Sequence, residues 1–172
     1  MADLLEFDLA ILAQSLVARL AQSSMTFTTV ESCTGGLVAA AITSVAGSSK
    51  VFGLGLVTYA NQAKMELAGV SSHLLDQYGA VSAEVAAAMA EGGLSLAAAD
   101  LALAITGIAG PDGGTATKPV GLVYFALARR GKTTVIRRRV FNGDRGAIRR
   151  QAVHYGLILV GDEGFEPPTP SV

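Results

Sequence analysis

The chain has 172 residues, of which 51% are hydrophobic and 16% are charged. This composition excludes a disordered chain and provides enough apolar material for one domain with a substantial core. The formal net charge of −1 excludes a strong overall field for nucleic acid or an anionic membrane surface. The single cysteine excludes an internal disulfide, and no apolar run is long enough to span a membrane. Together with an acidic N-terminus that lacks a signal-peptide pattern, these features predict a cytoplasmic location.

The first predicted element is an amphipathic helix over Leu4–Leu20, where leucines recur near helical spacing. Thr26–Val30 is rich in β-branched and aromatic residues and predicts a strand. A second helix is expected over Leu37–Val45, closed by Gly47. The residues between this strand and this helix therefore form a strand-to-helix turn.

That turn carries two hydroxyls, a thiol and two glycines, in the order Glu31-Ser32-Cys33-Thr34-Gly35-Gly36. The first turn of the following helix leaves amide groups without intrahelical partners, and its dipole favours negative charge. The segment therefore suits a phosphate, a carboxylate or an oxyanion formed in a reaction, with Ser32 placed as a nucleophile. The alternative is structural, because Ser32 or Thr34 can simply cap the helix.

The middle of the chain predicts a strand and three helices, with Asn61 and Ser82 as helix caps and Gly69 and Gly79 as helix stops. In order, these elements are expected at Val51–Ala60, Gln62–Ala68, Ser72–Tyr78 and 83–98. The strand that follows, Leu101–Thr106, is continuously apolar. Such a run is typical of a strand that is buried on both faces.

A loop dense in glycine, Gly107–Gly114, follows that strand and forms either a shaped backbone surface or an ordinary flexible connection. Val120–Ala128 and Thr133–Phe141 then predict an antiparallel hairpin. The arginines at 137–139 favour a solvated edge strand over a nucleic-acid stripe, because successive side chains of a strand alternate faces. The last helix is expected over Ala147–Val160, and the proline-rich remainder is expected to be disordered.

Helix-connected strands followed by a hairpin predict an α/β fold. We expect a three-layer α/β/α sandwich with a mixed, mainly parallel sheet of about five strands, one of them antiparallel. A single domain is expected over residues 1–161, with a disordered tail over residues 162–172. Ligands of such sheets gather at the carboxyl ends of the strands. Because Ser32, Tyr59 and Gly107 each lie at the end of a predicted strand, we expect them on one rim of the sheet.

A serine nucleophile on this rim needs a base. His73 and His154 are expected on helices away from the rim. Lys64 lies one turn into the helix after Tyr59, and it can act as a base when burial or a nearby cation lowers its pKa. Tyr59 could orient this lysine or relay a proton. The alternatives are a solvated helix lysine and a tyrosine that only packs at the end of a strand. The sequence has no metal-ligand cluster and no phosphate-loop signature, so we expect no metal and no cofactor.

Five segments in this order resemble the CinA C-terminal domain family, the competence/damage-inducible proteins: 31–36, 57–64, 106–114, 118–121 and 143–145. The resemblance covers about residues 26–160. Enzymatic members of this family are nicotinamide mononucleotide deamidases of the PncC type, so the resemblance implies an amidohydrolase that converts nicotinamide mononucleotide to nicotinate mononucleotide and ammonia. It also implies a three-layer α/β/α fold. The family's catalytic serine and lysine, assisted by a tyrosine, match Ser32, Lys64 and Tyr59.

Residue chemistry and resemblance together predict that neutral Lys64 takes the proton of Ser32, which attacks the carboxamide. The backbone N–H groups of residues 34–36 are the expected oxyanion donors, and Arg145 with the loop at 110–114 is the expected phosphate seat. The expected substrate-binding residues are Glu31, Thr34, Gly35, Gly36, Thr106, Gly107, Gly110, Gly113, Gly114 and Arg145. The rival hypothesis is a non-catalytic nucleotide-binding or regulatory module related to competence or DNA damage. The expected partner is a small pyridine mononucleotide, not nucleic acid or a membrane, and the alanine-rich helices favour a homo-oligomer.

Overall fold

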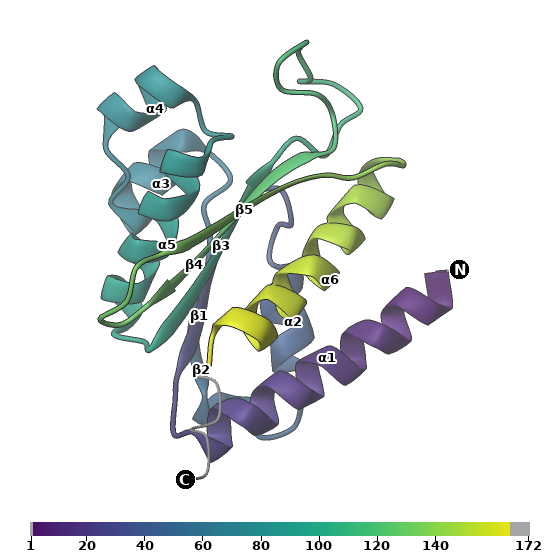
Figure 1. The fold of residues 1–172 in the computed structure, drawn as a ribbon, viewed down its shortest axis with the longest axis vertical. Coiled ribbons are helices and arrows are strands. Elements are labelled where there is room, and N and C mark those ends of the chain that lie inside the picture. Colours follow the sequence, from purple (N-terminus) through teal and green to yellow (C-terminus); the bar gives the residue numbers. More distant parts are fainter. Residues whose placement is uncertain (1, 166–172) are drawn as a thin grey trace, which may run out of the picture.

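The computed structural model describes residues 2–165 of the chain. Helices and strands alternate in the first part of the chain, which is followed by a run of helices, a run of strands and a last helix (Figure 1). In chain order, the elements are α1 (Ala2–Gln22), β1 (Phe27–Glu31), α2 (Leu37–Thr43), the short 3-10 helix η1 (Ser48–Lys50), β2 (Phe52–Val57), α3 (Asn61–Ala68), α4 (Ser72–Tyr78), α5 (Ala83–Ala97), β3 (Leu101–Gly107), β4 (Leu122–Arg129), β5 (Val135–Val140) and α6 (Arg145–Glu163).

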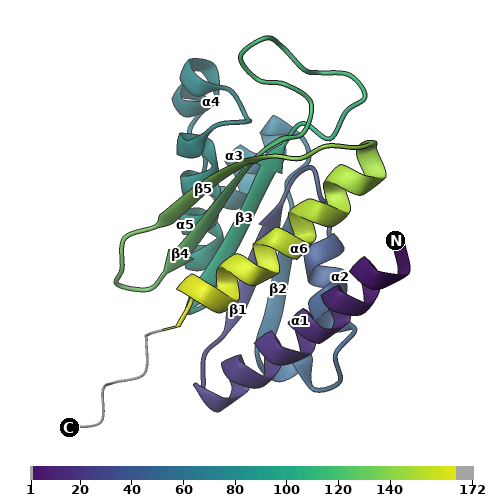
Figure 2. The same ribbon diagram turned by 45° about the vertical axis from the view of Figure 1, so that its right-hand side comes forward.

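The five strands form one mixed sheet in the order β2-β1-β3-β4-β5. β1 pairs in parallel with β2 and β3, whereas β4 is antiparallel to both β3 and β5. Four strands therefore point in one direction and only β4 opposes them. Helices α1, α2 and α6 cover one face of the sheet, and α3, α4 and α5 cover the other (Figures 1 and 2). The expected three-layer α/β/α fold, its single antiparallel strand and the terminal hairpin are confirmed.

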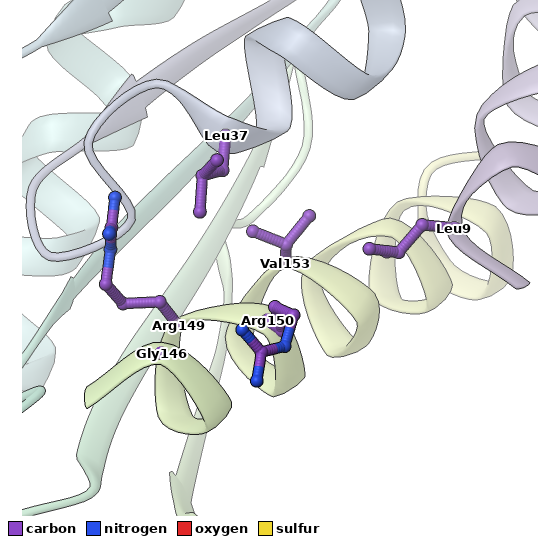
Figure 3. A pocket seen from close by; sticks show the side chains of 6 residues that line it. All are labelled: Leu9, Leu37, Gly146, Arg149, Arg150 and Val153. Carbon is purple, nitrogen blue, oxygen red and sulfur yellow. The ribbon is translucent and has the colours of Figure 1, made fainter. Parts of the chain in front are cut away.

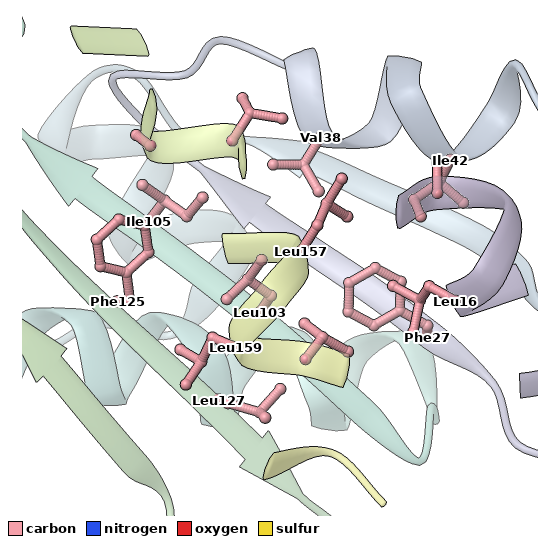
Figure 4. Packing of buried hydrophobic residues seen from close by; sticks show 14 of the residues in the cluster. Leu16, Phe27, Val38, Ile42, Leu103, Ile105, Phe125, Leu127, Leu157 and Leu159 are labelled. Carbon is pink, nitrogen blue, oxygen red and sulfur yellow. The ribbon is translucent and has the colours of Figure 1, made fainter. Parts of the chain in front are cut away.

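The two faces of the central strands carry side chains of different size. Large residues of β3 and β4 pack under α1 and α6, together with Phe27 and Leu157 (Figure 4). Four alternate positions of the same strands are alanines, at 102, 104, 126 and 128, and they pack in a cluster with residues of α5. Small side chains bring α5 close to the sheet, since a Cβ atom added at Gly93 would lie 2.2 Å from a methyl group of Val30. The alanines of β3 and β4 and Gly93 of α5 thus allow tight packing of this layer.

Three element boundaries near the candidate site differ from the expected ones. β2 ends at Val57 instead of Ala60, because its pairing partner β1 ends at Glu31, opposite Val57. Tyr59 therefore lies in the connection to α3. Asn61 is the first residue of α3 and not its cap, since the N-cap Ala60 is extended and makes no side-chain cap bond. α2 ends at Thr43, and Gly47, with a φ of 85°, precedes η1 instead of closing α2.

The last helix is longer than expected at both ends. It begins at Arg145, because the carboxylate of Asp144 accepts a hydrogen bond from the amide of Ala147 and caps the helix. It continues to Glu163, past the boundary at residue 161 that was expected for the domain. The remainder of the expected disordered tail, residues 166–172, lies outside the described residues. Among residues 2–165, no helix combines the length and the apolar character that a bilayer crossing requires.

Candidate active site

The turn that follows β1 is held by a carboxylate. Glu31 is completely buried, and its two oxygens accept hydrogen bonds from the amides of Gly36, Val38 and Ala39 at 2.9–3.1 Å. Glu31 thereby satisfies amides at the start of α2, which has no side-chain cap of its own. The sequence prediction gave this residue a substrate contact, but its side chain is already saturated by the backbone and does not line the cavity described below. Its role in the structure is to hold the turn.

Ser32 and Lys64 meet at the carboxyl end of the parallel strands. The Nζ atom of Lys64 lies 3.1 Å from the Oγ atom of Ser32. The lysine side chain is only 1% exposed although it comes from a helix, because it points inward beneath the connection between β2 and α3. Its Nζ atom also donates to the main-chain carbonyls of Thr58, at 2.8 Å, and Tyr59, at 3.4 Å. The expected meeting of residues 32 and 64 is present in the structure.

Burial makes the protonated form of the Lys64 amine less favourable. Loss of solvent lowers the pKa of its amine from the ordinary value of 10.5, and the Coulombic effect of Cys33 opposes this only in part. A neutral amine matches the three contacts well. Its two hydrogens can point at the carbonyls of Thr58 and Tyr59, and its lone pair can then accept the hydroxyl hydrogen of Ser32. In this state the lysine is a base in contact with the serine.

The thiol next to Ser32 is an unsuitable nucleophile. Cys33 is buried, and loss of solvent raises the pKa of its thiol from 9.0 to about 11. Because the thiolate is the reactive form of cysteine, the raised pKa makes this thiol less reactive at neutral pH than an ordinary cysteine. The geometry therefore favours the hydroxyl of Ser32 as the nucleophile of this turn.

A cavity of about 210 Å³ opens above the Ser32–Lys64 pair. The ends of β1, β2 and β3 all contribute to it, as the rim prediction requires. Its lining consists of Ser32, Cys33, Tyr59, Asn61, Lys64, Ala80, Val81, Thr106, Gly107, Ala109 and Arg145. Neither histidine belongs to this set. Among the described residues, no cluster of three or more histidine, cysteine or carboxylate side chains is arranged to hold a metal ion.

Tyr59 and Arg145 form a bridge over the mouth of this cavity. The Nη2 atom of Arg145 donates to the hydroxyl of Tyr59 at 2.9 Å, and its Nη1 atom donates to the carbonyl of Gly110 at 2.9 Å. The first residue of α6 thus links the glycine-rich loop to the connection after β2. Tyr59 contacts Lys64 only through its carbonyl, while its side chain is 61% exposed. The hydroxyl of Tyr59 therefore lies beside Arg145 at the mouth of the cavity, and its hydrogen-bond partner is not the amine of Lys64.

The remaining predicted residues divide into two groups. Thr106 and Gly107 line the cavity, and the hydroxyl of Thr106 donates to the carbonyl of Ala80. Six others do not line it: Thr34, Gly35, Gly36, Gly110, Gly113 and Gly114. The amide of Gly35 donates to the carbonyl of Ser32, and that of Gly36 donates to Glu31. These two amides are therefore engaged within the protein, and of the candidate oxyanion donors at residues 34–36 the amide of Thr34 remains.

Sequence reasoning missed two polar residues at this site. Asn61 lines the cavity together with Lys64, which follows it by three positions in α3. Residues at this spacing lie on the same face of a helix, so the position of Asn61 relative to Lys64 could have indicated it as a site residue. Arg149 in α6 donates from Nε to the carbonyl of Cys33 and from Nη2 to that of Thr34, both at 3.1 Å. These two hydrogen bonds hold the turn in place. No local pattern signals this contact, because more than a hundred residues separate the partners.

Comparisons with known proteins place this geometry in context. Residues 9–163 match the model of the CinA C-terminal domain. The chain is 53% identical over 144 residues to the nicotinamide-nucleotide amidohydrolase PncC of Escherichia coli K12, which covers 84% of this chain and 85% of that protein. It is 59% identical over 134 residues to a CinA-like protein of Geobacter sulfurreducens, covering 77% of this chain but 32% of that longer protein. The chain thus spans about a third of its longer relatives.

Solved structures have the same fold. The competence/damage-inducible protein CihA of Agrobacterium tumefaciens superposes with a TM-score of 0.87 at 42% identity, covering 89% of this chain and 93% of that one. A CinA superfamily protein of Escherichia coli superposes with a TM-score of 0.85 at 39% identity, covering 88% of each chain.

Proposed function

Because the chain belongs to the CinA C-terminal domain family, we propose that it hydrolyses the carboxamide of nicotinamide mononucleotide to nicotinate mononucleotide and ammonia. Relatives of similar length are named nicotinamide-nucleotide amidohydrolases. The observation that carries the proposal is the 3.1 Å contact between Ser32 and Lys64, a buried lysine whose pKa is lowered. Amide hydrolysis through an acyl-enzyme requires a nucleophile and base in this relation. A module that only bound nucleotides would not need a desolvated amine beneath a serine.

The first half of the reaction forms the acyl-enzyme. Neutral Lys64 takes the hydroxyl proton of Ser32 as the Oγ atom bonds to the carboxamide carbon. The carbonyl oxygen becomes an oxyanion, and the lysine now carries the proton. It delivers this proton to the amide nitrogen, the carbon–nitrogen bond breaks, and ammonia leaves. The pyridine ring is then joined to Ser32 as an ester.

The oxyanion needs a donor close to the nucleophile. The amides of Gly35 and Gly36 are engaged elsewhere, so the expected donor at Thr34 and the amide of Cys33 remain, and we assign this role to the main-chain N–H of Cys33. Donation by the residue that follows the nucleophile is a recurring arrangement in serine hydrolases. The bond from the amide of Gly35 to the carbonyl of Ser32 supports this assignment, because that carbonyl and the N–H of Cys33 belong to the same peptide plane.

The second half of the reaction restores the enzyme. A water molecule enters where ammonia left, and Lys64 takes one of its protons as the hydroxide bonds to the ester carbon. The Ser32–carbon bond then breaks, and the lysine returns its proton to Ser32. Nicotinate mononucleotide leaves, and both residues are ready for another turnover. One base thus serves both halves, as expected for a reaction that passes through two similar tetrahedral species.

The cavity suits the ring of the substrate, and its mouth suits the phosphate. A volume of about 210 Å³ is below the range of about 300–1,000 Å³ that encloses a drug-sized ligand, so the ring enters while the ribose phosphate stays outside. Arg145 is the cation at the mouth, and the hydroxyl of Tyr59 is bonded to it. We assign the phosphate to this pair, since a guanidinium binds phosphate through paired hydrogen bonds.

The experiment that tests this function measures ammonia and nicotinate mononucleotide released from nicotinamide mononucleotide by the purified chain. We expect equal amounts of both products. Ser32→Ala should reduce the rate by at least about a thousandfold, because no other group of the turn can form the ester. Ser44→Ala, at the end of α2, is the matched control and should leave the rate unchanged. Absence of both products with the parent chain would refute the function, and near-normal release by Ser32→Ala would refute the nucleophile.

A further inference from the structure

A second cavity lies behind the Ser32 turn, between α1, α2 and α6 (Figure 3). Its volume is about 340 Å³, compared with about 210 Å³ for the active-site cavity. The lining consists of Leu9, Leu37, Gly146, Arg149, Arg150 and Val153. None of these residues lines the active-site cavity. The proposed hydrolysis makes no use of this space.

Two guanidinium groups border this cavity without a carboxylate partner. Arg149 uses two of its N–H groups on the carbonyls of Cys33 and Thr34 and keeps further hydrogens free. In the described part of the chain, Arg150 makes no hydrogen bond or ion pair, and its Nε atom is buried without a partner. A nearby carboxylate, that of Asp144, caps α6 by accepting from Ala147. A guanidinium that lines a cavity and has no carboxylate partner favours a bound anion there.

The rest of the lining is apolar. Leu9 from α1, Leu37 from α2 and Val153 from α6 border the space beside the two arginines, as Figure 3 shows. Gly146 leaves room for the second guanidinium, since a Cβ atom added there would lie 3.1 Å from the Nη1 atom of Arg150. A ligand that fits both parts of this lining has an oxyanion attached to an apolar ring or chain.

We propose that this α1–α2–α6 cavity binds a small organic anion, and that the bound anion holds Arg149 against the turn that carries Ser32. The anion is a carboxylate or a phosphate on an apolar group, because a guanidinium recognises both. Arg149 is the link, since it lines the cavity and also donates to two carbonyls of the turn. Fixing its side chain restricts the motion of those peptides. Binding itself is independent of the proposed hydrolysis, and only its effect on turnover rests on that function.

The test is a titration of the full chain with benzoate, followed by nuclear magnetic resonance of backbone amides. Benzoate should bind with a Kd of about 1 mM and shift amides around residues 146–153. Nitrobenzene, a neutral molecule of the same shape, should bind at least about tenfold more weakly. Phenyl phosphate, titrated in parallel, distinguishes a phosphate site from a carboxylate site by which of the two anions binds more tightly.

Matched variants locate the anion. Arg150→Gln should weaken benzoate binding about tenfold. Arg138→Gln makes the same charge change on the exposed part of β5 and should leave the affinity unchanged. Amide hydrogen exchange adds a readout of the link, because benzoate should slow exchange in residues 33–37 of the parent and not of Arg150→Gln.

Several results would overturn the proposal. They are equal binding of benzoate and nitrobenzene, parent-like benzoate binding by Arg150→Gln, and no binding of either anion at 20 times the expected Kd, which is about 20 mM. Benzoate that occupies the active-site cavity instead would respond to Arg145→Gln and not to Arg150→Gln, which would also overturn it. Unchanged exchange in residues 33–37 at saturating benzoate would refute the link. None of these binding and exchange measurements depends on hydrolysis, so they test the cavity even if the chain releases no ammonia.

Discussion

Two buried ionisable groups lie at the carboxyl end of β1 and are used in opposite ways. Glu31 is surrounded by three backbone donors, so its carboxylate has little capacity left for a ligand. Lys64 is equally buried, but its amine faces two carbonyls and one hydroxyl, and loss of solvent lowers its pKa. The comparison teaches that burial alone does not make a catalytic group. What matters is whether the neighbours saturate the group or leave one of its positions for a proton in transit.

The largest effect is expected when the buried amine of Lys64 is removed. Lys64→Met keeps the length of the side chain and removes the base, so hydrolysis of nicotinamide mononucleotide should fall by at least about a thousandfold. The folded state should persist, because an apolar side chain replaces a buried amine. Steady-state ammonia release and a thermal melt measure the two effects. Lys50→Met, at an exposed position of η1, is the control, and comparable activity of the two variants would contradict the role of Lys64.

Substitution of Glu31 should instead reduce the stability of the folded chain. Glu31→Gln keeps the shape but turns one acceptor into a donor that faces backbone N–H groups, so the free energy of unfolding should drop by about 2–3 kcal/mol. Urea denaturation measures this loss. Glu84→Gln, in the first turn of α5, is a control with the same chemical change. If Glu31→Gln unfolded like the parent while its turnover was abolished, Glu31 would belong to the chemistry and not to the turn.

A smaller effect is expected at the mouth of the cavity. Tyr59→Phe removes the hydroxyl that accepts from Arg145 and leaves intact the carbonyl that contacts Lys64. We therefore expect KM to rise up to about tenfold with little change in kcat. Tyr78→Phe at the end of α4 should change neither constant. A loss confined to kcat would mean that the tyrosine hydroxyl takes part in proton transfer.

The smallest expected effect is in the pH dependence of stability. Because the folded state lowers the pKa of Lys64 below 10.5, the unfolded chain binds more protons, and stability should rise with pH up to that value. Cys33 acts in the opposite direction between pH 9.0 and about 11, since its folded pKa is raised. The contribution of the lysine is therefore measured below pH 9.0, by urea denaturation of the parent and of Lys64→Met. Parallel pH profiles for the two proteins would contradict a lowered pKa.

Much of this arrangement could be predicted from sequence. The element order indicated a mixed α/β sheet, and the rule that ligands gather at strand ends brought residues 32, 59, 64 and 107 to one rim. A local pattern also identified the cap at Ser82, since a short polar side chain before an apolar run acts locally.

Other features depended on contacts that no local pattern encodes. Glu31 was expected to bind the substrate, but its carboxylate accepts from three backbone amides. The sequence of the turn does not show which amides lie around a carboxylate. Tyr59 was expected to orient the lysine or relay a proton, but its hydroxyl accepts from Arg145, and its contact with Lys64 is through its carbonyl. Arg149 was missed because it reaches the turn from the far end of the chain. Side-chain direction and long-range partners are set by tertiary packing, which a single sequence does not show.

The most direct test of the central claim is the pKa of the Lys64 amine itself. Nuclear magnetic resonance of lysine labelled at the carbon next to Nζ, with the signal assigned by its absence from Lys64→Met, would follow the titration in the folded parent. We predict a transition clearly below the ordinary lysine value of 10.5, so that a useful fraction of the amine is neutral beside Ser32. A transition at or above 10.5 would leave the lysine protonated under working conditions and would contradict its role as the base.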